Sequence, residues 1–282
     1  MQSNRPEGRS RTSKTVRDGM LVLLTVAAGC VDAASYLGLG QVLTAAMTGN
    51  TILLGLAIGQ AKIQAALRSC AALVGFVLGA VLAAAIAKRG AKDAVWPRGV
   101  TATLAVELVV LVAFALGWHF AGEEAAEMAN DLYMLIGAAG FAMGMQSVAV
   151  HRLRVAGVST TYVTGTLTNS AVRFVGWLRA LRGAAAARSA EPDPEQSGQA
   201  AKVNGPGYPL LVWLAYGAGA VFAGGVELWW PDAPVFLVIA GDTVELRWFS
   251  AALLLPILII AAIATTAAIG HRLGRVDASR SR

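Results

Sequence analysis

GCVDAASYLGLGQVLTAAMTGNTILLGLAI, residues 29–58, is the stretch that decides how this chain folds. It places an acid, Asp32, inside an apolar run, and it places the tripeptide Thr48-Gly49-Asn50 inside a second run after a glycine-containing turn. Soluble cores avoid an unpaired acid of this kind, and a simple membrane anchor has no use for an interrupted apolar run. Transporters and channels use both features. The stretch therefore indicates a polytopic membrane protein with polar groups in its interior.

The composition points the same way. Of the 282 residues, 56% are hydrophobic and only 14% are charged, and the mean hydropathy is +0.59. A soluble domain carries about 25% charged residues. The formal net charge of +6 comes from basic residues in the tails and short loops, which is typical of cytoplasmic loops rather than of a nucleic-acid surface. We therefore expect the lipid bilayer as a partner and no binding of nucleic acid.

The number of membrane crossings depends on the loop charges. Apolar runs fall at about residues 19–38, 42–59, 68–87, 99–119, 131–150, 158–178, 208–229 and 248–270. If all eight runs cross, three loops break the preference of Lys and Arg for the cytoplasmic side. If runs 42–59 and 158–178 enter and leave on one side, only the loop at 60–68 breaks it. We therefore expect an all-α polytopic protein with six transmembrane helices, two broken or re-entrant segments and both termini in the cytoplasm. Eight spanning helices are the alternative.

An internal repeat accompanies this arrangement. Met47-Thr48-Gly49-Asn50 in the first half matches Val163-Thr164-Gly165-Thr166 in the second, and Phe76–Val81 matches Tyr216–Val221. Each Thr-Gly segment follows a helix that ends in a small polar patch, Gly29–Asp32 in the first half and Gly144–Ser147 in the second. Each half then has three crossings, and because three is odd, the second half is inverted relative to the first. Inverted repeats with paired, glycine-interrupted segments point to a site near the midplane of the membrane.

The repeat also predicts the domain organisation. We expect a single membrane domain at 18–270, with repeats at about 18–119 and 131–270. A flexible cytoplasmic insertion is expected at 183–207, which is rich in Ala, Pro, Glu and Ser. Residues 1–17 are expected to be a disordered cytoplasmic tail, and residues 271–282 a basic cytoplasmic tail.

These motifs resemble the YoaK family of bacterial membrane proteins, which is catalogued as a domain of unknown function. The likeness rests on VDAASYLGLGQVLTAAMTGNTILLGLA (31–57), MGMQSVAVHRLRVAGVSTTYVTGTLTN (143–169) and FVLGAV (76–81). It covers about residues 18–270 without the insertion. The resemblance implies a bacterial inner-membrane protein of about six helices. It transfers no catalytic or binding residues, so the site candidates rest on residue chemistry.

Two acids at membrane depth are the first candidates. An Asp at the centre of a membrane helix costs roughly 2.5–3.5 kcal/mol on insertion scales, so it needs a proton, a partner or a polar cavity. Asp32 is either a proton-coupling or cation-binding carboxylate, or a packing acid that bonds to backbone freed by the broken segment. Glu107 has only apolar neighbours in sequence, and it is either functional or an acid at a structural or oligomer interface.

The Thr-Gly pairs are the second candidates. Glycine permits the backbone angles that interrupt a helix, and an interrupted helix exposes N–H and C=O groups that bind ions or polar solutes. Alternatively, Thr and Gly only allow close helix contact. The remaining candidates for substrate or ion binding are Thr48, Gly49, Asn50, Gln146, Thr164, Gly165 and Thr166. The ladders Gly55–Gly59, Gly75–Gly79 and Gly140–Gly144 are expected to pack helices together.

The sequence gives no support for catalysis. The three histidines fall at the ends of apolar runs without metal-ligand spacing, and the two cysteines are too few for a metal site, so we expect no enzyme, metal or cofactor. The first hypothesis is a transporter or channel for a small solute, coupled to protons if Asp32 titrates. The second is a non-transporting scaffold or sensor whose polar residues lock helices together. A polar cavity facing Asp32 favours the first, and an Asp32 bonded to backbone in a dry bundle favours the second. The sequence leaves the substrate, and whether the protein forms a homo-oligomer, open.

Overall fold

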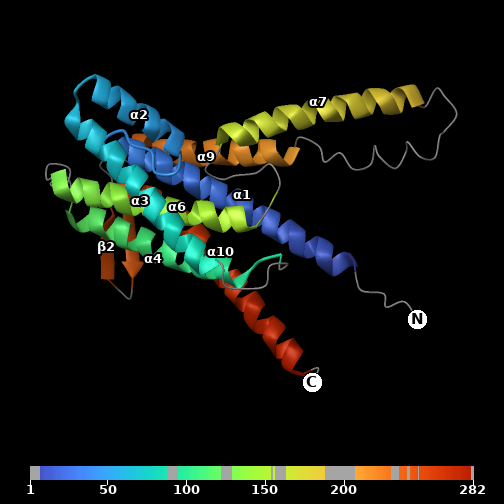
Figure 1. Cartoon of the computed structure of the whole chain (residues 1–282). Helices are drawn as coiled ribbons and strands as arrows, with labels where there is room; N and C mark the ends of the chain where they lie inside the picture. Colours follow the sequence, from blue (N-terminus) through green and yellow to red (C-terminus); the bar gives the residue numbers. More distant parts are fainter. Residues whose placement is uncertain are drawn as a thin grey trace.

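A computed structural model of the chain is a bundle of helices with a small hairpin at one end (Figure 1). The structure describes residues 7–87, 95–121, 129–153, 155, 163–187, 207–229, 235–239, 242–246 and 248–280. The helices are α1 (Glu7–Gly38), α2 (Met47–Gly59), α3 (Ile63–Ala87), α4 (Arg98–Ala121), α6 (Ala129–Arg152), α7 (Val163–Ala187), α9 (Gly207–Trp229) and α10 (Trp248–Arg280).

Six of these helices are long and apolar enough to cross a membrane. The spans are Lys14–Gly38, Ile63–Ala87, Arg98–His119, Asn130–Arg152, Gly207–Trp229 and Ala252–His271. They correspond to the six runs expected to cross, and the two runs expected not to cross are α2 and α7. The choice of six spans over eight is therefore confirmed, and the protein is an all-α, multi-pass membrane protein.

The two remaining helices fall short of a span for different reasons. Helix α2 has only 13 residues, which at 1.5 Å per residue is about 20 Å, against a hydrocarbon thickness of about 30 Å. Helix α7 has 25 residues, but Arg173, Arg179 and Arg182 lower its hydropathy. It is one unbroken helix, and residues 158–162 of the expected segment lie outside the described residues.

Several helices run past the boundaries expected from the sequence. Helix α1 begins at Glu7, directly after Pro6, so residues 7–17 continue the first span as helix instead of forming a disordered tail. Proline is favoured at helix starts, and no second proline interrupts the chain before the span. Helix α10 likewise continues through the expected tail to Arg280. Helix α7 extends to Ala187, and the rest of the expected insertion, 188–206, lies outside the described residues.

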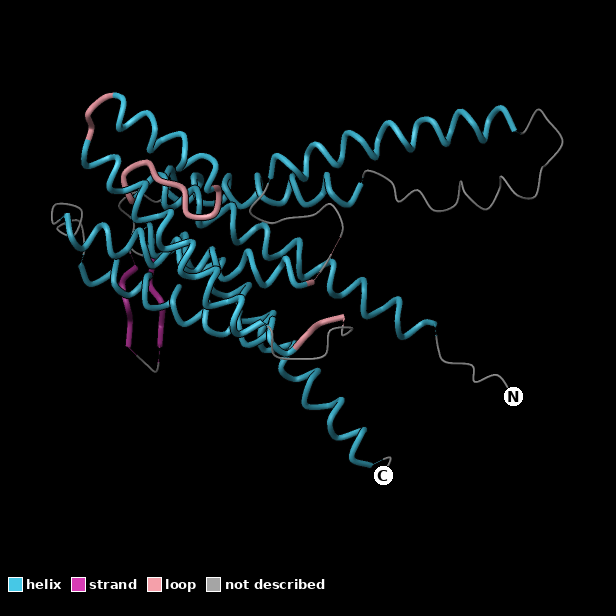
Figure 2. The backbone as a smooth tube through the Cα atoms, in the orientation of Figure 1, coloured by secondary structure: helices cyan, strands magenta, loops and turns pink. Residues whose placement is uncertain are grey.

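A β-hairpin, which was not expected from the sequence, joins α9 to α10. Strand β1 (Val235–Ile239) pairs antiparallel with β2 (Asp242–Leu246), with Val235 opposite Leu246 and Ile239 opposite Asp242. The VFLVI and DTVEL segments are rich in residues that favour strands, but both are far shorter than the apolar runs from which the helices are predicted. Figure 2 shows the hairpin as the strand pair at the end of the helical bundle away from the N- and C-termini.

Glycines bring two pairs of helices into backbone contact. A Cβ at Gly75 or Gly79 of α3 would overlap with carbonyl oxygens of α6, and a Cβ at Gly144 of α6 would overlap with the carbonyl of Phe76 in α3. Helices α1 and α9 form the second close pair, through Gly29 and Gly219. The packing role of the ladders at 75–79 and 140–144 is therefore confirmed. The role predicted for Gly55 and Gly59 is wrong, because both face open space.

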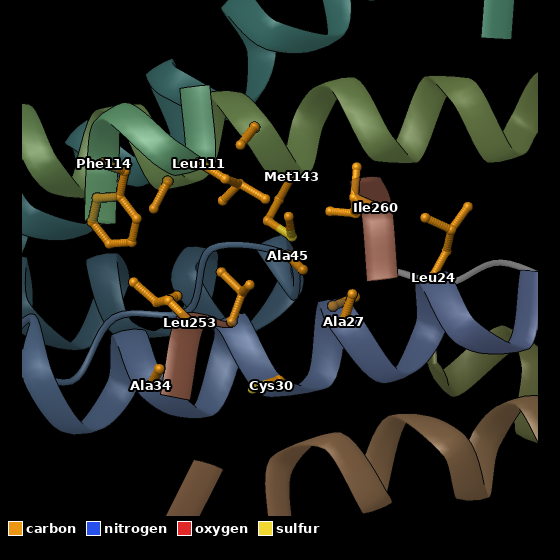
Figure 3. Close-up of a cluster of buried hydrophobic side chains, with 14 of the residues drawn as sticks. Leu24, Ala27, Cys30, Ala34, Ala45, Leu111, Phe114, Met143, Leu253 and Ile260 are labelled. Atoms are coloured by element: carbon orange, nitrogen blue, oxygen red, sulfur yellow. The ribbon is translucent and has the colours of Figure 1, made fainter. Parts of the chain in front are cut away.

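The core lies where α1, α4, α6 and α10 meet. Helix α4 packs against α6 and α10, and α10 packs against α1. Figure 3 shows buried side chains from all four helices converging, together with Ala45 from the segment between α1 and α2. The labelled members are Leu24, Ala27, Cys30, Ala34, Leu111, Phe114, Met143, Leu253 and Ile260. Because Ala45 belongs to this cluster, the α1–α2 connection is packed inside the protein.

Candidate functional site

Asp32 lies in α1 and is bonded to the segment that leads into α2. The backbone N–H groups of Thr44 and Ala45 donate to Oδ1 of Asp32 at 2.6 and 2.5 Å. The N–H of Ala46 donates to Oδ2 at 3.0 Å. These groups precede the first turn of α2, where no helical partner exists for them, and a carboxylate is the acceptor that such N–H groups favour most.

A fourth donor comes from the other half of the chain. The hydroxyl of Tyr216 in α9 donates to Oδ2 of Asp32. Tyr216 reaches this position because Gly29, one turn before Asp32, lets the backbone of α9 approach α1 closely. The Thr44 hydroxyl lies 3.4 Å from Oδ1 and 3.3 Å from the hydroxyl of Ser35. The carboxyl group is buried and surrounded by donors, so it joins α1, α2 and α9.

Asn50 closes the same segment from the other side. Its Oδ1 accepts the N–H of Leu43 at 3.0 Å, and its Nδ2 donates to the carbonyl of Leu43. The turn that starts the segment passes through Gly40 and Gln41, which have φ angles of 78° and 66°. Only a residue tolerant of the left-handed region fits there, and glycine fits without strain. Asp32 and Asn50 together hold residues 43–46; we call this arrangement the Asp32 clamp.

Glu107 has a different environment. It lies in the middle of α4, its side chain is fully buried, and among the described residues no donor reaches either carboxyl oxygen. Gln146 of α6 is also fully buried. Its Nε2 donates to the carbonyl of Leu24 in α1 at 2.8 Å, while its Oε1 has no donor in the described part of the chain.

The structure divides the candidate residues instead of gathering them into one site. Gln146 bonds to Leu24, and Asp32 lies eight residues further along α1, about 12 Å along the helix axis. Thr48 is exposed and Gly49 is half-buried beside the clamp. In α7, Thr164 is exposed, Gly165 is half-buried and Thr166 is buried. Asp32 and Asn50 thus form one polar group, and neither Glu107 nor Gln146 is hydrogen-bonded to it.

Sequence reasoning missed Tyr216 as a partner of Asp32. The signal was present, because Tyr216 replaces Phe76 at the same position of the internal repeat, and this exchange adds one hydroxyl group. The backbone donors at Thr44, Ala45 and Ala46 have no sequence signal of their own. Within the described residues, no three His, Cys, Asp or Glu side chains gather as metal ligands would.

Comparisons with known proteins agree with this architecture. The profile of the family described as "Protein of unknown function (DUF1275)" matches residues 20–244. The chain is 39% identical over 159 residues to the UPF0700 transmembrane protein YoaK of Bacillus subtilis (strain 168), an alignment that covers 56% of this chain and 67% of the relative. No solved structure matches the chain. The family profile covers all but the start, the last helix and the tail, and it confirms the resemblance that the motifs suggested: the chain belongs to the DUF1275, or YoaK, family of membrane proteins.

Proposed function

We propose that this protein is a membrane transporter for a small solute, built from an inverted repeat whose two halves interlock. One observation carries the proposal. A Cβ at Gly29 would overlap with the carbonyl of Tyr216, and a Cβ at Gly144 would overlap with the carbonyl of Phe76. In the repeat, Tyr216 corresponds to Phe76 and Gly29 corresponds to Gly144, so the two contacts are the same contact with the halves exchanged.

A second pair of contacts follows the same rule. A Cβ at Gly79 would meet the carbonyl of Phe141, and a Cβ at Gly219 would meet the carbonyl of Val26. Each pair again consists of equivalent positions in opposite halves. At the level of whole helices, α1 packs on α9 as α6 packs on α3, and α2 packs on α3 as α7 packs on α9. These exchanges are the ones that a two-fold axis between the halves would produce.

This symmetry favours transport over a static role. In secondary transporters with inverted repeats, one half or bundle rocks against the other, and polar groups near the interface of the halves bind the solute or the coupling ion. Here glycines bring the backbones of α1 and α9, and of α3 and α6, into contact across the two halves. The buried polar groups of Glu107 and Gln146 lie within the bundle that such a motion would open.

We further propose that the protein lies in the bacterial inner membrane with both termini in the cytoplasm. The support is the distribution of basic residues: the 88–98 loop, the 152–154 segment and the residues after 271 all fall on one side if the six spans alternate. The ends of α1 and α10 also point to the same end of the bundle (Figure 1). We assign no enzymatic activity.

The test is transport by the purified full chain. The protein is reconstituted into liposomes with an imposed proton gradient and supplied with a panel of labelled amino acids, organic acids, sugars, nucleobases and inorganic ions. We expect one class to accumulate with protein and not in protein-free vesicles, and to raise the melting temperature of the protein in detergent. The test variant is Gly79→Ala, whose added methyl group would overlap with the carbonyl of Phe141 in the other half. The control is Gly217→Ala, whose added methyl group meets no atom within 4 Å.

A scaffold or sensor subunit is the second candidate. The observation that favours it is the Asp32 clamp, because Asp32 is bonded to backbone and not aimed at a solute. If no member of the panel accumulates or shifts the melting temperature, and Gly79→Ala behaves as Gly217→Ala in every assay, the scaffold replaces the transporter.

A further inference from the structure

The interior of the bundle holds a second set of polar side chains, separate from the Asp32 clamp. Thr25, Thr103, Glu107 and Gln146 are all buried. The hydroxyls of Thr25 and Thr103 donate to the carbonyls of Leu21 and Gly99, one turn back on their own helices, both at 2.8 Å. The two threonines are therefore satisfied locally. The groups left without a donor, within the described residues, are the Glu107 carboxyl oxygens and Oε1 of Gln146.

Helix register places Glu107 and Gln146 at the same height. Figure 3 shows Leu111 of α4 and Met143 of α6 facing each other in the core. Helices α4 and α6 are consecutive spans and run antiparallel. One turn toward the N-terminus of α4 and one turn toward the C-terminus of α6 therefore lead to the same depth in the bundle. Glu107 is one turn back from Leu111, and Gln146 is one turn forward from Met143. Both are buried and lie on the core-facing sides of their helices, as Leu111 and Met143 do.

Within the described residues, no positively charged side chain lies beside Glu107 to balance its ionised form. Among the helices packed on α4, α6 has His151 and Arg152 at its end, more than a turn beyond Gln146. Helix α10 has His271, which lies level with Thr101 because Nε2 of His271 is 3.3 Å from the Thr101 hydroxyl. Helix α3 has no ionisable side chain between Ala71 and Ala87, and the ionisable groups of α4 itself, Arg98 and His119, are near its ends. A bare carboxylate at this depth costs several kcal/mol, so another partner is required.

A proton fits this group better than a metal ion. A protonated carboxyl group gains one O–H donor, and an amide oxygen is an acceptor, so a single proton pairs Glu107 with Oε1 of Gln146. A hard metal cation takes six or more oxygen ligands. The unpaired oxygens here come from only two side chains, and the nearby Thr103 hydroxyl already donates to the carbonyl of Gly99.

From this arrangement we infer that Glu107 and Gln146 form a proton-binding site in the bundle. Glu107 carries the proton and donates it to Oε1 of Gln146, while Nε2 of Gln146 is fixed by the Leu24 carbonyl. The inference deepens the proposed transport function by naming the coupling ion and its acid: Glu107, and not Asp32. The proton comes from water when the halves expose this side of α4, and it returns to water on the opposite side.

The site links three helices from both halves. Gln146 belongs to α6 in the second half, whereas Glu107 and Leu24 belong to α4 and α1 in the first half. Separating α4 from α6 breaks the Glu107–Gln146 bond and lets water reach the carboxyl group. Loss of the proton then leaves an ionised carboxylate, which is costly to bury when the bundle closes again. Proton occupancy and closure of the bundle are therefore coupled through this one hydrogen bond.

The test reads the proton directly. Infrared difference spectroscopy on the full chain in lipid nanodiscs detects the C=O stretch of a protonated carboxyl group, which shifts on exchange into D2O. At neutral pH we expect wild type to show this band, Glu107→Gln to lose it, and Asp32→Asn to keep it. Gln146→Leu is expected to keep the band but move it to the frequency of a carboxyl group without a hydrogen-bond partner.

Four outcomes overturn the inference. They are a wild type without the band, a Glu107→Gln variant that retains it, a Gln146→Leu variant with an unshifted band, and a band that disappears when sodium is added. Glu107→Gln is nearly isosteric, and its amide N–H₂ can donate to Gln146, so it is expected to fold. The readout requires no solute. A protein that holds this proton and moves nothing would remove only the transport proposal, whereas a transporter without the band would remove only the proton site.

Discussion

Asp32 and Glu107 are two buried acids in one membrane bundle, and they differ in how many hydrogen-bond donors the described residues offer them. Asp32 accepts three backbone N–H groups and the hydroxyl of Tyr216. Glu107 has no donor in the described part of the chain. Asp32 meets the expectation that an acid at membrane depth needs a partner, a proton or a cavity, and for Glu107 we propose a proton. The comparison teaches that depth alone does not distinguish two acids: the described residues supply four donors to Asp32 and none to the carboxyl oxygens of Glu107, which is why we propose the proton site at Glu107.

The largest expected effect is the loss of the Asp32 carboxyl group. Asp32→Ala leaves the N–H groups of Thr44, Ala45 and Ala46 buried without an acceptor, and each such group costs about 1–3 kcal/mol. We expect the free energy of unfolding in mixed micelles to fall by about 3–5 kcal/mol, or the protein to fail to accumulate. Asp32→Asn keeps one acceptor oxygen and should lose less than half as much. If Asp32→Ala were as stable as wild type, Asp32 would have no greater structural role than Glu107.

The second prediction concerns the approach of the helices that completes the clamp. Gly29→Ala inserts a methyl group against the Tyr216 carbonyl and pushes α9 away from Asp32. Overpacking of this kind costs about 1–3 kcal/mol. The equivalent Gly144→Ala should cost a similar amount by separating α6 from α3. Gly217→Ala in α9 is the control, because its Cβ meets nothing and it should be neutral or slightly stabilising in thermal melts.

A smaller effect is expected at the far side of the clamp. Asn50→Ala removes the two hydrogen bonds to Leu43 and should lower the free energy of unfolding by about 1–2 kcal/mol. Thr48→Ala, two residues away and exposed, is the matched control and should change little. Hydrogen–deuterium exchange at residues 43–46 gives the local readout: exchange should rise in Asn50→Ala and stay at the wild-type level in Thr48→Ala.

The smallest effect on stability is expected at Glu107. Glu107→Gln should leave the free energy of unfolding within about 0.5 kcal/mol of wild type, because the amide keeps the size of the side chain and can donate to Gln146. Proton-driven uptake by the same variant should be lost. A large loss of stability would instead assign Glu107 a structural role like that of Asp32, and the two acids would no longer differ.

The number of spans and the non-crossing segments could be predicted from the sequence because they depend on local quantities. The length of each apolar run and the placement of Lys and Arg are enough to separate α2 and α7 from the six spans. The glycine ladders of α3 and α6 could be predicted for the same reason, since close packing requires small residues at a helical period. Gly55 and Gly59 have the same spacing, but spacing does not say which face meets a neighbour.

The partners of Asp32 could not be predicted, because they are long-range or carried by the backbone. Thr44, Ala45 and Ala46 contribute backbone N–H groups, which every residue type except proline has, and Tyr216 lies 184 residues away in the chain. Gln146 lies in the segment Gly144–Ser147, which matches Gly29–Asp32 in the repeat. Matching segments of a repeat need not be close in space, however, and Gln146 of α6 bonds to Leu24 of α1, about two turns before Asp32.

The packing of helices from one half on helices of the other also affects when each helix finds its neighbour during synthesis. Helix α1 packs against α9, and α3 packs against α6, so neither half can cover its own glycine-lined surfaces. At about 5–20 residues per second, the roughly 170 residues between the end of α1 and the start of α9 take roughly 10 to 30 seconds to synthesise. During that interval Asp32 lacks its Tyr216 donor, and α1 sits in the bilayer without its main neighbour. Because α3 and α4 pack mainly on α6, which is made much sooner after them, α1 is the helix of the first half that waits longest for its main neighbour.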